Sequence, residues 1–127
     1  MSLLYSIVES PAHTDFSPLY RKLGIDELKL NSQRKAINQL KHLTPHWVVA
    51  EFFYGFGNHY AGVNVSNLDV FLHSLRKYAP EARVIVLASP RDYPHLDKLT
   101  SLFAIHAVLR TPVDQQDLER ILRGAGA

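Results

Sequence analysis

Short, almost uninterrupted apolar runs separate amphipathic stretches along most of this chain. Val84–Leu87 contains only aliphatic residues, and Trp47–Phe53 is apolar apart from Glu51. Continuous apolar strands are typical of a parallel sheet that is covered on both faces, whereas alternating strands keep one face in water. Between the runs, large apolar residues recur at helical spacing. The pattern therefore predicts the α/β class, with a five-stranded parallel sheet and helices on both of its faces.

The expected strands and helices alternate from one end of the sequence to the other. Strands are predicted at residues 3–8, 27–30, 47–53, 84–87 and 105–109. Helices are predicted to begin at Ser17, Ser32, Asn67 and Asp114, and a further one to include Leu96, Leu99, Leu102 and Phe103. A chain of 127 residues has the size of one domain, so we expect residues 1–127 to form a single core.

Composition and local motifs argue against several kinds of chemistry. The chain has no cysteine, which rules out disulfides, thiolate catalysis and cysteine-ligated metal. Its seven histidines are scattered, and no glycine-rich phosphate-binding loop follows the first expected strand. No serine lies in a Gly-x-Ser-x-Gly elbow. We therefore expect no metal, no cofactor and no enzymatic activity.

Charge and hydropathy narrow the range of partners. The net charge of +2 is small and gives no support to nucleic-acid binding. No apolar run reaches membrane-spanning length, and the N-terminus lacks a basic segment followed by a long apolar core. We expect a cytoplasmic protein whose partner is neither a nucleic acid nor a membrane.

Three segments carry a resemblance to a known family: Pro45–Glu51, Tyr78–Ser89 and Val108–Leu122. The first is a proline-led strand that ends on a carboxylate, and the second passes from a helix through a proline into a buried strand. The third joins an apolar strand, Thr-Pro, an acidic residue and an amphipathic helix. With these segments the chain resembles, over nearly its whole length, the receiver domain of two-component response regulators. The resemblance implies the (βα)5, flavodoxin-like topology and a cis bond between Thr111 and Pro112.

The residues that perform phosphorylation in receivers are not preserved at the matching positions. Receivers hold Mg²⁺ with two acids after the first strand, accept phosphate on an aspartate of the third, and place a hydroxyl on the fourth and a lysine on the fifth. The matching residues here are Glu9 and Ser10, Glu51, Ala88 (or Ser89 after a one-residue shift), and Thr111, which precedes Pro112. Val108 takes the place of an aromatic switch residue. The resemblance thus implies a degenerate phosphoacceptor site.

Two interpretations of Glu51 stay open. In the first, its carboxylate mimics a phosphoryl group and holds a constitutive signalling state, although a phosphorylated side chain carries roughly −1.5 to −2 charges at neutral pH. In the second, it is an ordinary strand-end carboxylate that is paired with a basic group or hydrated. Because burial without a partner costs several kcal/mol, we expect Glu51 at the end of its strand, facing a crevice or a cation.

An aromatic cluster, Phe52–Tyr60, enters a loop rich in glycine and asparagine. Loops at the carboxyl edge of a parallel sheet are common binding sites for ligands and partners. The same rings could equally fold over the vacant phosphate pocket as a lid.

Taken together, these features predict a receiver-like signalling domain that works through protein–protein interaction without phosphorylation. Receivers commonly pair through the last strand and the last two helices, which is consistent with a homodimer. The alternatives are a small-molecule or cofactor sensor that uses the loop at 52–65, and a retained phosphoacceptor. The residues expected at the partner surface are Phe56, Tyr60, Arg110, Gln115, Leu118, Arg120 and Arg123.

Overall fold

The computed structural model describes residues 2–8, 15–54 and 66–124. Four of the predicted site positions, Glu9, Ser10, Phe56 and Tyr60, lie outside the described residues. The interpretations placed on them therefore stay predictions.

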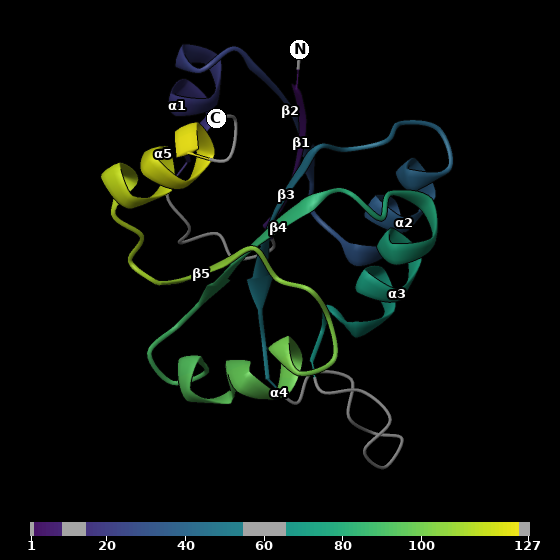
Figure 1. The fold of residues 1–127 in the computed structure, drawn as a ribbon, viewed down its shortest axis with the longest axis vertical. Helices are drawn as coiled ribbons and strands as arrows, with labels where there is room; N and C mark the ends of the chain where they lie inside the picture. Colours follow the sequence, from purple (N-terminus) through teal and green to yellow (C-terminus); the bar gives the residue numbers. More distant parts are fainter. Residues whose placement is uncertain (1, 9–14, 55–65, 125–127) are drawn as a thin grey trace.

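Five parallel strands form one sheet, in the order β2-β1-β3-β4-β5. The chain winds outward from β1 to β2, returns past β1, and then winds in the other direction through β3, β4 and β5 (Figure 1). In such sheets, ligands bind outside the carboxyl ends of the strands where the winding reverses, here between β1 and β3. The predicted fold class is confirmed. The strands are β1 (Ser2–Ile7), β2 (Ile25–Leu30), β3 (Trp47–Phe52), β4 (Arg83–Ala88) and β5 (Ala107–Arg110).

Helices cover both faces of the sheet, with α1 and α5 on one side and α2 and α3 on the other (Figure 1). Each face has its own apolar cluster, and alternate residues of β3 contribute to the two. Val48, Ala50 and Phe52 pack in the cluster with α2 and α3, whereas Trp47 and Val49 pack with α1 and α5. The helices are α1 (Ser17–Lys22), α2 (Gln33–Leu40), α3 (Asp69–Tyr78), α4 (Leu96–Thr100) and α5 (Gln115–Gly124).

Local chemistry explains where several elements begin and end. The Ser32 hydroxyl accepts a hydrogen bond from the Lys35 N–H at 3.2 Å and caps α2, as the sequence predicted. Gly24, between α1 and β2, has a φ of 72°, a conformation that glycine adopts without steric cost. The carboxylate of Asp114, the residue before α5, accepts from the Gln116 N–H in the first turn of the helix at 2.8 Å.

Two predicted apolar helix faces extend too far. Leu43 lies beyond the end of α2 and is 46% exposed, and Leu102 lies beyond the end of α4 and is 53% exposed. In the second case the chain turns after Thr100, and Phe103 enters the core while Leu102 does not. The predicted cis bond between Thr111 and Pro112 is confirmed.

None of the helices within the described residues combines the length and the apolar character needed to cross a bilayer.

Candidate functional site

Glu51 is the central residue of the candidate site. It is the penultimate residue of β3 and is only 8% exposed. Because side chains alternate along a strand, Glu51 faces the same side as Trp47 and Val49, toward α1 and α5. Its register partner on β4 is Leu87, which packs in the apolar cluster on that side. The predicted position near the carboxyl end of the strand is confirmed.

The backbone around Glu51 is held by a buried asparagine, Asn67, which lies two residues before α3. The side-chain amide of Asn67 donates to the carbonyl oxygen of Glu51 at 2.9 Å, and its oxygen accepts from the Phe53 N–H at 2.7 Å. The Asn67 N–H also donates to the Phe53 carbonyl at 3.3 Å. Asn67 therefore forms hydrogen bonds with the backbone at the end of β3, as a neighbouring strand would. These bonds fix the path of the chain through Glu51.

A second buried pair supports that asparagine. Ser66 donates to the Asp69 carboxylate through its N–H at 2.8 Å and its hydroxyl at 2.9 Å. The Ser66 oxygen in turn accepts from the Leu68 N–H at 3.1 Å. Ser66 also forms an isolated antiparallel bridge with Tyr54. Sequence reasoning missed this group, although a serine followed three residues later by an acid is a recognisable helix-start signal.

The two candidate hydroxyl positions at the end of β4 differ sharply. Ala88 is 1% exposed and its methyl group packs in the cluster with α2 and α3. Ser89 follows the strand, and its hydroxyl accepts from the Asp92 N–H at 3.3 Å and donates to the Asp92 carboxylate at 3.4 Å. The Asp92 carboxylate also lies 3.5 Å from Nε of Arg91. The hydroxyl nearest this strand end is therefore part of a turn.

The end of β5 contributes a neutral residue where receivers have a lysine. Thr111 is half-buried, and its N–H donates to the Ala88 carbonyl at 2.8 Å, which extends the β4–β5 ladder. The preceding Arg110 is exposed, and its guanidinium carbon lies 5.5 Å from the ring centre of Tyr93. Val108 is half-buried against the α2–α3 cluster.

The described residues do not provide a magnesium site. Mg²⁺ requires near-octahedral oxygen ligands. Of the described strand-end residues that match the receiver site, Glu51 is the one carboxylate, and no group of three or more potential metal ligands occurs within the described ranges. The described residues therefore do not fit the ligand requirement of Mg²⁺. Glu9, the other predicted acid, lies outside the described residues.

One histidine pair in the sequence has the spacing of metal ligands. His42 and His46 are four residues apart, but α2 ends at Leu40, so they do not share a helical face. The Nδ1 atom of His46 already accepts a hydrogen bond from the Leu3 N–H at 3.0 Å. The two histidines therefore do not form a metal site.

A cavity of about 490 Å³ adjoins the carboxyl ends of β1 and β2. Its lining contains both acidic and basic side chains. The Asp15 carboxylate lies 3.4 Å from Nζ of Lys29, and the Glu27 carboxylate accepts a hydrogen bond from the Ser17 hydroxyl. Hydrogen bonding from Ser17 lowers the pKa of Asp15 to about 2. Burial, with smaller contributions from Glu27 and Asp15, raises the pKa of Tyr20 well above its usual range. The volume is that of a small-molecule site.

The predicted partner surface needs one correction. Arg110, Gln115, Arg120 and Arg123 are exposed, as expected. Leu118 is not, because it is 0% exposed and packs in the cluster between α1, α5 and the sheet. It lies on the apolar stripe of α5 and cannot contact a partner directly.

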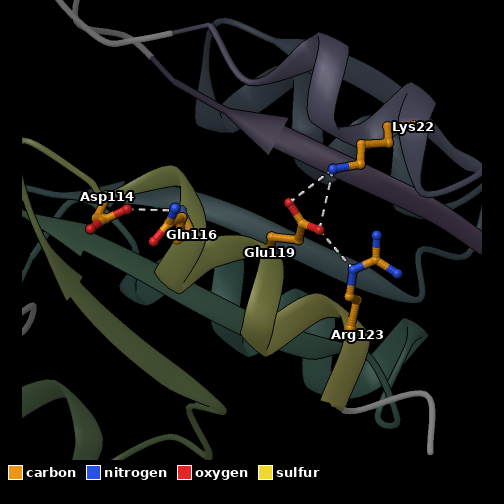
Figure 2. Close-up of polar contacts among 5 residues, drawn as sticks. All are labelled: Lys22, Asp114, Gln116, Glu119 and Arg123. Atoms are coloured by element: carbon orange, nitrogen blue, oxygen red, sulfur yellow. Dashed lines mark hydrogen bonds and ion pairs between the residues drawn. The ribbon is translucent and has the colours of Figure 1, made fainter.

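Charged side chains join the outer face of α5 to α1. Figure 2 shows the Glu119 carboxylate between Lys22 of α1, at 3.4 Å, and Nε of Arg123, at 2.7 Å. The hydrogen bond from Arg123 is the main reason why the pKa of Glu119 is lowered. On the same helix, Arg120 and Asp117 form an ion pair at 2.9 Å.

No protein-family model matches the sequence, and no curated protein does either. Several solved structures match the fold over nearly the whole chain. A response regulator receiver protein from Pseudomonas putida has 17% identity and a TM-score of 0.73, over 97% of this chain and 96% of that one. A putative response regulator from Chloroflexus aurantiacus has 12% identity and a TM-score of 0.73, over 97% and 95%.

A further match is the receiver domain of a sensor histidine kinase from Pseudomonas aeruginosa, solved with a magnesium ion coordinated in its active-site cleft. It has 12% identity and a TM-score of 0.73, over 99% of this chain and 98% of that one. Identities this low compare folds rather than sites. The chain therefore has the fold of response-regulator receiver domains.

Proposed function

We propose that this protein is a cytoplasmic, receiver-like signalling domain that binds a protein partner and neither accepts a phosphoryl group nor catalyses a reaction. The observation that carries the proposal is the set of residues at three strand ends, Glu51, Ala88 and Thr111. In a working receiver these positions accept the phosphoryl group, donate to it and neutralise its charge.

Each of these replacements removes or displaces a group that phosphoryl transfer depends on. Enzymatic phosphoryl transfer relies almost entirely on positioning and electrostatic stabilisation. The carboxylate of Glu51 stands on a stem one methylene longer than that of aspartate, the methyl group of Ala88 lies in the core, and Thr111 carries no charge. The described strand ends thus supply neither the ligands for a divalent cation nor the cation that would balance a phosphoryl group.

The partner surface that we propose consists of β5, α5 and the turn after α4. It exposes Arg110, Gln115 and Arg120, together with Leu102, whose side chain is 53% exposed. An exposed leucine among arginines and polar residues is the composition of an interface with an apolar centre and a polar rim. A second copy of this chain is the partner that the resemblance to receivers favours.

The oligomeric state in solution tests this surface. We expect the Leu102→Asp variant to weaken self-association or partner capture at least tenfold, because it places a charge at the apolar centre. Light scattering across a concentration series, and a pull-down with the purified chain as bait, measure the two effects. The control is Val70→Asp, since Val70 is 54% exposed on α3, outside the proposed surface. Equal behaviour of the two variants would refute the proposed surface.

A second candidate function, small-molecule sensing, is favoured by the cavity at the carboxyl ends of β1 and β2. The aromatic loop that the sequence suggested for this role lies mostly outside the described residues. Native mass spectrometry of freshly purified protein separates the two functions: a stoichiometric co-purified molecule would favour the sensor, and a bare chain that still binds its protein partner would favour the interaction domain.

A further inference from the structure

A second cavity, of about 460 Å³, lies at the amino ends of the strands, away from the candidate site. The first residues of four strands line it: Ser2, Ile25, Trp47 and Arg83. The sheet register places Ser2 beside Ile25, and Trp47 beside Arg83. Ile25 and Trp47 belong to the apolar cluster under α1 and α5, so the cavity opens on that face of the sheet.

The inner surface of this cavity is apolar. Leu23, at the end of α1, and Leu122, in the last turn of α5, face Ile25 and Trp47 across it. The Trp47 ring is 5% exposed, and His106 packs edge-on against it with ring centres 5.6 Å apart. A rigid aromatic ring with aliphatic neighbours forms a surface on which the apolar body of a small molecule can pack.

The polar lining consists of hydrogen-bond donors and positive charge. Arg83 is exposed, its guanidinium carbon lies 5.8 Å from the Trp47 ring centre, and it forms no ion pair with any described carboxylate. Arg123 binds Glu119 through Nε, and Figure 2 shows the other two nitrogens of its guanidinium lying away from Glu119. Among the described lining residues there is no acidic side chain.

His46 adds a third donor. Its Nδ1 accepts a hydrogen bond from the Leu3 N–H at 3.0 Å, so a neutral His46 carries its hydrogen on Nε2. The His46 backbone is held on both sides, because its N–H donates to Leu3 at 2.8 Å and its carbonyl accepts from Arg83 at 3.0 Å. The imidazole therefore stands on a fixed segment between β1 and β4.

We propose that this cavity binds a small organic anion, a carboxylate or phosphate monoester that carries an apolar body. Guanidinium groups bind both kinds of oxyanion with paired, charge-assisted hydrogen bonds. Two arginines and a histidine around an apolar floor match a ligand with a charged head and a planar or aliphatic body. The cavity at the carboxyl ends of β1 and β2 does not share this preference, because Asp15 and Glu27 line it.

The position of Trp47 makes the proposal directly measurable. It is the only tryptophan in the chain, so tryptophan fluorescence and the single indole N–H signal in an NMR spectrum both report on this cavity. We would titrate the intact protein with benzoate and with phenyl phosphate, and with benzyl alcohol as the uncharged probe. We expect saturable changes at Trp47 with at least one anion at roughly millimolar concentrations, and at least tenfold weaker binding of the alcohol. Comparing the two anions identifies the preferred head group.

Substitution of one rim arginine completes the test. Arg83→Gln removes a charge from an exposed side chain and should weaken anion binding at least tenfold, while Arg34→Gln, at an exposed position of α2 on the other side of the sheet, should leave it unchanged. Circular dichroism confirms that both variants are folded. Any of three results would overturn the proposal: no response of Trp47 to either anion, equal binding of benzyl alcohol, or unchanged affinity in the folded Arg83→Gln variant.

Discussion

Replacing Asn67 by alanine is expected to lower the free energy of unfolding by about 2–4 kcal/mol. The substitution removes both hydrogen bonds that its side chain makes to β3, at 2.9 Å to the Glu51 carbonyl and 2.7 Å from the Phe53 N–H. Each backbone group would then be left unsatisfied in a protected position, at a cost of about 1–3 kcal/mol. Urea denaturation measures the loss.

Asn38→Ala is the matched control, because Asn38 is exposed on α2 and its side chain makes none of these contacts. Its effect should stay within about 0.5 kcal/mol. A loss for Asn67→Ala that is as small as the control's would mean that the end of β3 does not depend on this side chain, and that Glu51 is positioned by something else.

The second large effect is expected at Leu118, whose replacement by alanine should cost about 2–5 kcal/mol. The side chain is 0% exposed and packs between α5 and the sheet, so its truncation removes buried contacts and leaves a cavity. Leu118→Met, which nearly conserves the volume, should cost less than about 1.5 kcal/mol. Urea denaturation of the three proteins gives these differences.

Gln115→Ala provides the surface comparison, because Gln115 is exposed at the beginning of α5. We expect that variant to unfold within about 0.5 kcal/mol of the natural sequence. If Leu118→Ala were equally mild and instead weakened partner capture, then Leu118 would be a contact residue, and its placement in the core would be wrong.

The Leu118 case shows how a resemblance can mislead where the residues themselves are informative. Leu118, Ile121 and Leu122 form an apolar stripe at helical spacing, which predicts burial against the sheet. The likeness to a paired receiver surface suggested exposure for the whole face. In the structure the stripe faces the core, and the exposed positions are its polar neighbours such as Arg120.

The fold was predictable because its main signal is local. Each buried strand is a short apolar run, and most helix boundaries have a cap, a proline or a glycine nearby. Helix length was less predictable. Leu43 and Leu102 fit the apolar spacing, yet both lie beyond the last helical turn, because tertiary contacts decide where the chain turns away.

The site was predictable only in part. The position of Glu51 followed from its interruption of an apolar run near the end of a strand, and the structure places it there. The partnership with Asn67 joins residues 16 positions apart, and no sequence period connects an asparagine at a helix start to a particular strand carbonyl. The Ser66–Asp69 pair did have a local signal, and only its role in supporting the end of β3 needed the structure.

The central claim is that the strand ends around Glu51 no longer seat a divalent cation and a phosphoryl group. The most direct measurement is an amide NMR spectrum of the ¹⁵N-labelled protein, recorded with Mg²⁺ alone and then with Mg²⁺ and beryllofluoride, a phosphoryl analogue. We predict unchanged signals at Glu51, Ser89 and Thr111, both in the natural sequence and in a Glu51→Asp variant, which restores the acid type but not the missing lysine. A saturable, Mg²⁺-dependent shift of these signals in the natural sequence would contradict the account.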